Sequence, residues 1–232
     1  MNKETRKKVK LFAWKYFIVD VARILAAPSV FLFLRPKWLY ENENAKKTIR
    51  GAAVVVSNHD SFLDPMYIMI AVWYRRMRIL ATSDLYQHKS LDFFLRVVRC
   101  IKVDKKNFNF STVREVSDSL NEGEVVTIFP EGTINDGTQE SVRAFKSGAV
   151  LMAQKGNAPI VPIYIDQRPN WLHRQCYVMG EPIQMTGAGG GRATLMDINR
   201  ITDELQKKEL KLKAIMEAYH HKTQKNGGNS HV

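Results

Sequence analysis

The stretch GAAVVVSNHDSFLDP, residues 51–65, decides the fold class of this chain. It opens with an apolar run rich in valine, which is typical of a buried β-strand. His59 comes directly after that run, and the carboxylate of Asp64 follows five positions later. Pro65 fits the first position of a helix, and Asp64 fits its cap. We therefore expect a strand, a turn and a helix, with polar side chains gathered at the turn.

The same alternation continues along the chain. Further strands are expected at 78–82, 101–104, 124–130, 159–165 and 175–183, and helices at 65–77, 91–100, 110–123, 142–157 and 197–222. Strands that alternate with helices predict an α/β fold, with a mostly parallel central sheet flanked by helices. We expect the strand at 175–183 to lie antiparallel at an edge of this sheet.

Composition divides the chain into three parts: residues 1–40, an α/β domain at 41–186, and a Gly-rich linker, C-terminal helix and frayed tail at 187–232. In the first part, Lys8, Lys15 and Arg23 fall on one side of a helical pattern, and the rest of the circumference is apolar. Pro28 is expected to kink or divide this segment. Its internal charges disfavour a membrane-spanning helix. We expect amphipathic helices lying on an anionic membrane surface, and the alternative is an ordinary helix packed on the domain.

The formal net charge of +12 calls for an acidic partner: nucleic acid, an anionic membrane or a phosphorylated substrate. The sequence contains no recognisable nucleic-acid-binding motif, so we expect no nucleic-acid partner. Its two cysteines suggest neither a disulfide framework nor a zinc cluster. The remaining histidines are scattered without ligand spacing, so we expect them at the surface and expect no metal; they are His88, His173, His220, His221 and His231.

His59 and Asp64 are the candidate catalytic residues. Polar groups at the carboxyl ends of parallel strands gather where open α/β sheets hold their sites. A carboxylate on one imidazole nitrogen orients the ring and stabilises its protonated form, which leaves the other nitrogen to act as a general base. The alternative is that Asp64 only caps the helix and His59 only fills the loop.

A second motif, VVTIFPEGT at 125–133, also ends a strand abruptly. Gly132 allows a close backbone approach, and the backbone amides beside Glu131 and Thr133 are candidates to hold phosphate or an oxyanion. The alternative is a turn without a chemical role. Lys105, in VDKK, and Lys146, in FKSGA, are candidate phosphate contacts or simply solvated surface lysines.

The motifs NHDSFLD, VDKK, FPEGT, FKSGA and IVPIYI, in this order, resemble those of the glycerolipid acyltransferase superfamily. Its best-known members are the 1-acylglycerol-3-phosphate acyltransferases, and the resemblance covers about residues 50–185. It implies transfer of an acyl group from acyl-CoA or acyl-carrier protein to the hydroxyl of a lysophospholipid, without a cofactor. It also implies that His59 is the general base, that Asp64 orients it, and that Glu131, Gly132 and Thr133 bind the acceptor.

The sequence departs from the family pattern at the phosphate contacts. Lys105 stands where the family usually has arginine, and Ile134 replaces the arginine of EGTR. Isoleucine cannot bind phosphate, whereas arginine binds it with two hydrogen bonds. We expect an enzyme of phospholipid biosynthesis, peripheral or monotopic on the cytoplasmic face of a membrane. The alternative is a catalytically idle relative that binds lipid or acyl-carrier protein.

Overall fold

A computed structural model describes residues 17–104, 110–134, 145–166, 174–187 and 194–228. Its centre is a seven-stranded sheet with the order β1-β7-β6-β2-β5-β3-β4. The neighbouring strands run parallel except for β6 and β7, which are antiparallel. The strands are β1 (Lys37–Tyr40), β2 (Ala53–Ser57), β3 (Met77–Thr82), β4 (Ile101–Val103), β5 (Val125–Ile128), β6 (Ile160–Ile165) and β7 (Cys176–Met179).

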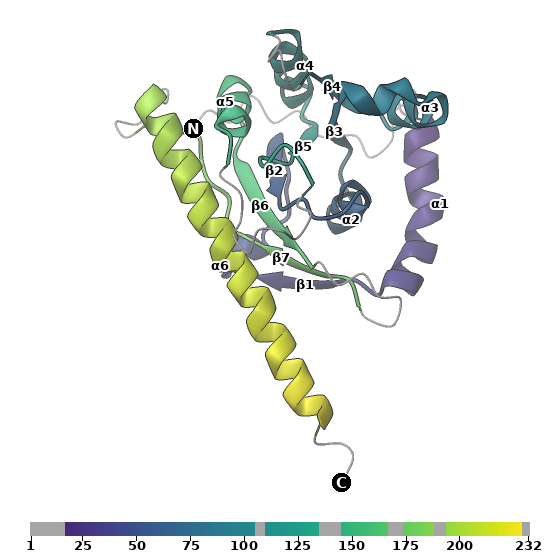
Figure 1. The fold of residues 1–232 in the computed structure, drawn as a ribbon, viewed down its shortest axis with the longest axis vertical. Helices are drawn as coiled ribbons and strands as arrows, with labels where there is room; N and C mark the ends of the chain where they lie inside the picture. The colour runs from purple at the N-terminus through teal and green to yellow at the C-terminus, as the bar shows by residue number, and fades with distance from the viewer. Residues whose placement is uncertain (1–16, 105–109, 135–144, 167–173, 188–193, 229–232) are drawn as a thin grey trace.

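The helices cover both faces of this sheet (Figure 1). They are α1 (Phe17–Leu34), α2 (Asp64–Ala71), α3 (Lys89–Val97), α4 (Phe110–Asn121), α5 (Gly148–Lys155) and α6 (Leu195–Gly228), with short 3-10 helices at Asn44–Lys46 and Ser83–Gln87. The predicted α/β fold with a mostly parallel, helix-flanked sheet is therefore confirmed. The helix predicted at 142–157 begins later, at Gly148.

The central strand β2 is buried on both faces, as its valine-rich sequence predicts. Val54 and Val56 pack with α4, α5 and the first half of α6, whereas Ala53 and Val55 pack with α2 on the other face. The two-residue period of a strand separates these sets. A strand with no solvent-facing side must leave its polar groups for the end of the strand, and Asn58 and His59 follow there.

Two expectations about the edge of the sheet need correction. The strand predicted at 175–183 is antiparallel to β6, as expected, but β7 is not the edge strand. The edge is β1, which pairs with β7 in parallel and was not predicted. This strand lies within the segment assigned from its composition to membrane-associating helices. Its four residues, KWLY, are too few to show the two-residue period of a strand.

Helix α1 runs without interruption through Pro28, so this proline does not divide the segment. Asp20 is fully buried and forms an ion pair with Arg76, whose Nη2 lies 2.7 Å from Oδ2 of Asp20. One side of α1 therefore packs on the domain, while Leu25 and Leu32 remain more than 70% exposed. No helix in the described part of the chain is long and apolar enough to span a bilayer.

Candidate active site

The site is built around His59 and Asp64, which the turn after β2 brings together. Nδ1 of His59 lies 3.1 Å from Oδ2 of Asp64, whose side chain is only 5% exposed. The same oxygen accepts the backbone N–H groups of Asp60 and Ser61, each at 2.7 Å. Because a carboxylate can only accept hydrogen bonds, Nδ1 of His59 carries the proton and Nε2 is left as the basic nitrogen.

This arrangement corrects the expectation that Asp64 caps helix α2. The N-cap is Leu63, and Asp64 is the first residue of the helix. The Asp64 carboxylate points back to the amides of the turn rather than forward to those of the helix. Its hydrogen bonds to these amides and to Nδ1 of His59 hold the turn between β2 and α2 together and orient the imidazole.

Asn58 holds the other side of His59 to the neighbouring strand β6. Its Oδ1 accepts the N–H of Ile165 at 2.8 Å, and its Nδ2 donates to the Ile165 carbonyl at 3.1 Å. Nδ2 also donates to Asp60, at 2.7 Å. A buried amide with these partners forms a rigid connection between two strand ends. His59 is thus fixed by hydrogen bonds to the residues on both sides of it.

The second predicted motif lies beside the first, because β5 neighbours β2 in the sheet. The ring of Phe129 stacks on the imidazole of His59 at a centroid distance of 4.2 Å. Gly132 has a φ of +74° and donates its N–H to the Phe129 carbonyl at 3.1 Å. That amide is therefore already bonded within the turn, and the predicted contact of Glu131, Gly132 and Thr133 with the acceptor stays a prediction.

The residues expected to bind the acceptor differ in their accessibility. The Glu131 side chain is buried, with 6% exposed, whereas Thr133 lies exposed at the surface of the loop. Ile134, in place of the family arginine, is also exposed. In this motif, Glu131 is therefore buried, while Thr133 and Ile134 are exposed to solvent.

Lys146 lies next to this loop, as the FKSGA motif suggested. Its Nζ would be 3.2 Å from a β-carbon built on Gly132, and its backbone N–H donates to the Pro130 carbonyl at 3.2 Å. Lys146 is exposed and forms no ion pair with any residue that the structure describes. Lys105 lies outside the described residues, so its predicted phosphate contact stays a prediction.

Two further polar residues near this edge come from helix α6. Glu209 is fully buried and accepts the backbone N–H of Asn58. His220, expected at the surface, is largely covered, and its Nε2 lies 3.0 Å from Oδ2 of Asp166 after β6. One signal for Glu209 was present in the sequence. It falls among Ile201, Leu205, Leu212 and Met216, at the helical spacing of a buried apolar stripe.

The motif order and this site geometry agree with a comparison against protein families. A family model described as Acyltransferase matches residues 38–166, which is more than half of the chain. This chain belongs to the Acyltransferase family. The match ends at Asp166, so helix α6 lies outside it.

This acyltransferase-family chain has curated relatives that are named 1-acyl-sn-glycerol-3-phosphate acyltransferases. It is 34% identical over 124 residues to the 1-acyl-sn-glycerol-3-phosphate acyltransferase of Bacillus subtilis, covering 53% of this chain and 59% of that protein. It is also 34% identical over 155 residues to the mouse 1-acyl-sn-glycerol-3-phosphate acyltransferase alpha, covering 62% and 52%. The chain therefore matches about half to six-tenths of the length of these relatives.

A solved structure shares the fold of this acyltransferase-family chain. It is the 1-acyl-sn-glycerophosphate (LPA) acyltransferase PlsC from Thermotoga maritima, with a TM-score of 0.56 and 18% sequence identity. The superposition covers 88% of this chain and 86% of the Thermotoga chain. The likeness thus extends well beyond the residues of the family model.

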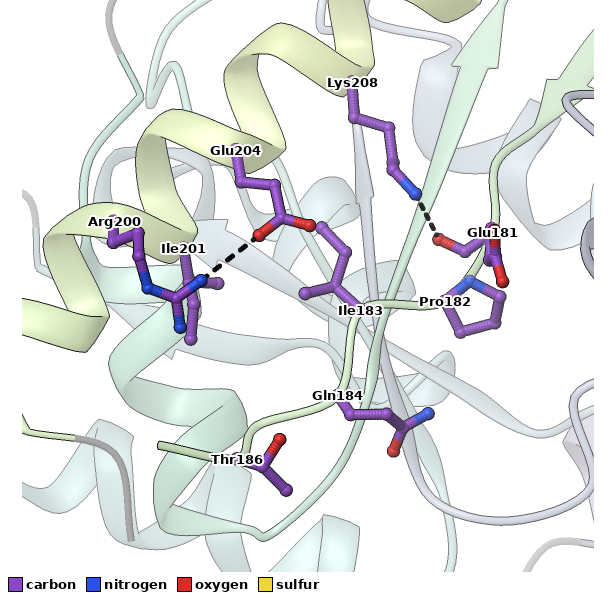
Figure 2. Close-up of a pocket in the computed structure, with 9 residues that line it drawn as sticks. All are labelled: Glu181, Pro182, Ile183, Gln184, Thr186, Arg200, Ile201, Glu204 and Lys208. Carbon is purple, nitrogen blue, oxygen red and sulfur yellow. Dashed lines mark hydrogen bonds and ion pairs between the residues drawn. The ribbon is translucent and has the colours of Figure 1, made fainter. Parts of the chain in front are cut away.

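A polar pocket of about 330 Å³ lies away from the His59 site (Figure 2). It includes Ile183, which bridges to Ile160 at the start of β6, the end of that strand opposite Ile165. Its cations are engaged, since Lys208 donates to the Glu181 carbonyl and Arg200 pairs with Glu204. Neither His59 nor Asp64 lines this pocket. No group of three His, Cys, Asp or Glu side chains within the described residues is arranged to hold a metal ion.

Proposed function

We propose that this chain transfers a fatty acyl group from a thioester, acyl-CoA or acyl-carrier protein, to the hydroxyl of a lysophospholipid, as a step of phospholipid biosynthesis. The observation that carries the proposal is the His59–Asp64 pair, with its 3.1 Å contact at the carboxyl end of the central strand. The names of the curated relatives support a lysophosphatidate-like acceptor.

The geometry fits a direct transfer in which His59 acts as the general base. Asp64 accepts the Nδ1–H hydrogen bond, so Nε2 of His59 takes the proton from the acceptor hydroxyl. The hydroxyl oxygen then forms a bond to the thioester carbonyl carbon, and the carbon–sulfur bond breaks. The proton passes from Nε2 to the departing thiolate. A thioester is already activated, so this route uses no serine nucleophile, metal or cofactor.

Phosphate recognition in this proposal rests on lysines. Lys146 offers an exposed ammonium group next to Gly132, and Lys105 follows β4 in the sequence. A lysine acts as a point charge, whereas the arginine that Ile134 replaces would grip phosphate with two hydrogen bonds. Restoring the arginine with Ile134→Arg should therefore lower the KM for lysophosphatidate, while Lys146→Ala should raise it.

Association with an anionic membrane is proposed to involve α1 and the residues before it. Ile24, Leu25, Leu32 and Phe33 of this helix are all more than 55% exposed. Exposed apolar side chains, in a segment that follows a cation-rich stretch in the sequence, match an interfacial helix. This would place the protein on the cytoplasmic face, where anionic lipids are enriched.

Membrane binding is tested by sedimentation with vesicles of mixed neutral and anionic lipid. Leu25→Glu with Leu32→Glu should reduce binding strongly. A matched control is Leu195→Glu with Met196→Glu, because both residues are at least 80% exposed but begin α6, which lies across the molecule from α1 (Figure 1). Equal loss in both double variants would contradict a specific role for α1.

The activity is tested by thiol release from acyl-CoA or acyl-carrier protein in detergent, with and without lysophosphatidate and other lysolipids. Release that depends on an acceptor, and is abolished in folded His59→Ala, is the expected result. Release with another lysolipid alone would identify a different acceptor. The absence of release with both donors and all acceptors would overturn the activity and favour the idle lipid-binding relative, which Ile134 suggests.

A further inference from the structure

Glu209 lies in the middle of α6 on the side that packs against the sheet. Its side chain is fully buried, and its Oε1 accepts the backbone N–H of Asn58 at 3.1 Å. Its other oxygen, Oε2, has no hydrogen-bond partner in the described part of the chain. Burying a carboxyl oxygen without a hydrogen bond costs free energy, whereas an apolar side chain at this buried position of α6 would not incur that cost. Packing alone therefore does not account for a carboxyl group here.

The hydrogen bond from the Asn58 backbone N–H links Glu209 to the residue that precedes His59. Asn58 directly precedes His59, and its side chain is already fully engaged with Ile165 and Asp60. Within the part of the chain that the structure describes, its backbone N–H donates to Glu209 alone. If that acceptor were lost, the buried amide would need another partner, and the Ser57–Asn58 peptide unit, one residue before His59, would turn.

The charged groups around Glu209 disfavour its ionised form. Asp60, in the turn after β2, and Glu131, in the turn after β5, are carboxyl neighbours, and Tyr164 approaches from β6. No lysine or arginine among the described residues forms an ion pair with Glu209. Burial, and then the charges of Glu131 and Asp60, raise the pKa of Glu209 well above 4.5, although the Asn58 hydrogen bond opposes this shift.

We propose that Glu209 is a positioning residue for acyl transfer, which holds the backbone of Asn58, and through it the His59 imidazole, as an uncharged carboxylic acid. This inference rests on the proposed function of His59. It adds a contribution from the C-terminal helix to a site that otherwise lies within residues 38–166.

Two substitutions separate the hydrogen bond from the charge. Glu209→Gln keeps an acceptor for the Asn58 N–H and is always neutral, so we expect kcat to stay within about threefold of the wild type. Glu209→Leu continues the apolar stripe but removes the acceptor, and we expect kcat to fall about tenfold to a hundredfold. KM should change little, because the Glu209 side chain is fully buried. Glu217→Leu, at an exposed position of the same helix, is the matched control.

Stability as a function of pH tests the uncharged state of Glu209. A raised pKa means that the stabilising contribution of Glu209 is complete below about pH 4.5 and is lost as pH rises through the folded-state pKa. Glutamine has no proton to lose. The stability of Glu209→Gln relative to the wild type should therefore increase from about pH 5 to about pH 8, measured by denaturant unfolding. A difference that is flat across this range would overturn the uncharged state.

Hydrogen exchange tests the positioning role without relying on turnover. In folded Glu209→Leu, the amides of residues 58–61 should exchange faster, while Glu209→Gln and Glu217→Leu should match the wild type. If the wild type shows no acyl transfer, the proposed function fails, but exchange and stability still decide the role of Glu209. Unchanged exchange at 58–61 in Glu209→Leu, or unchanged kcat in an active enzyme, would overturn the positioning role.

Discussion

The imidazole of His59 lies stacked on the ring of Phe129, with the ring centroids 4.2 Å apart and the planes inclined by 22°. The two residues follow the ends of the neighbouring strands β2 and β5, so the stack joins the two motifs of the site. The Phe129 ring covers one face of the imidazole with an apolar surface. The stack and the Asp64 hydrogen bond together restrict both the tilt and the rotation of the imidazole.

Replacing the aromatic ring tests this restriction. Phe129→Leu keeps most of the volume but removes the stack, which is worth about 0.5–1.5 kcal/mol for an aromatic pair. We expect kcat to fall about two- to tenfold, with a stability loss below about 1.5 kcal/mol. Phe129→Tyr, which keeps the ring, is the control. Equal kcat values for the leucine and tyrosine variants would argue against a role for the stack.

Asp64→Asn tests whether the carboxylate sets the tautomer of His59. An amide can still satisfy part of the turn, but it can donate to Nδ1 and so favour the wrong tautomer. By analogy with the corresponding substitution in serine-protease triads, kcat should fall about 10³- to 10⁴-fold. The pH–rate profile should be measured with circular dichroism on the same samples. A folded variant with near-normal kcat would reduce Asp64 to a structural residue.

Gly132→Ala should harm both the loop and the lysine beside it. Gly132 has a positive φ, and a β-carbon there would lie 3.2 Å from Nζ of Lys146. The left-handed conformation costs alanine about 1–2 kcal/mol, and the ammonium group must move. We expect lower stability and a higher KM for the phosphorylated acceptor. Gly51→Ala is the control, because a β-carbon at Gly51 meets nothing within 4 Å.

The buried ion pair of Asp20 and Arg76 should anchor α1. Both Nη2 and Nε of Arg76 donate to the Asp20 carboxylate, which is fully buried. Asp20→Ala leaves the guanidinium without this partner and should cost about 3–5 kcal/mol of folding free energy. Urea unfolding measures this loss. Asp92→Ala, which breaks the exposed pair with Arg96, should cost less than about 1 kcal/mol.

Glu41 links α6 to the end of β1. It accepts the Glu181 N–H at 2.8 Å and pairs with Lys211 at 2.9 Å. Burial would raise the pKa of Glu41, but the Glu181 amide, Lys211 and Lys208 outweigh it and lower the pKa below 4.5. This contribution is present at neutral pH and is lost as pH falls through the lowered pKa. Glu41→Gln should therefore destabilise the protein at pH 7 and make little difference at about pH 3. An equal loss at both pH values would contradict this account.

Local patterns in the sequence carried much of the prediction. The buried strand before His59 and the helix after it follow from a valine-rich run and a proline, because both signals act over a few residues. The contact of His59 with Asp64 is also local, since a single turn separates them. The prediction that Asp64 caps helix α2 was wrong. Its position in the sequence allowed its carboxylate to accept either the amides of the helix or those of the turn, and the conformation of the turn selected the amides of Asp60 and Ser61.

The sequence by itself thus determined the α/β alternation, the motif order and the pairing of His59 with Asp64, since these depend on short-range chemistry. Only the tertiary structure decided which distant side chains complete the site. Phe129 meets His59 because β5 lies beside β2, and Glu209 meets Asn58 because α6 packs across the sheet. Such contacts depend on strand order and helix packing, which are fixed by the burial of the whole apolar surface rather than by any single stretch of residues.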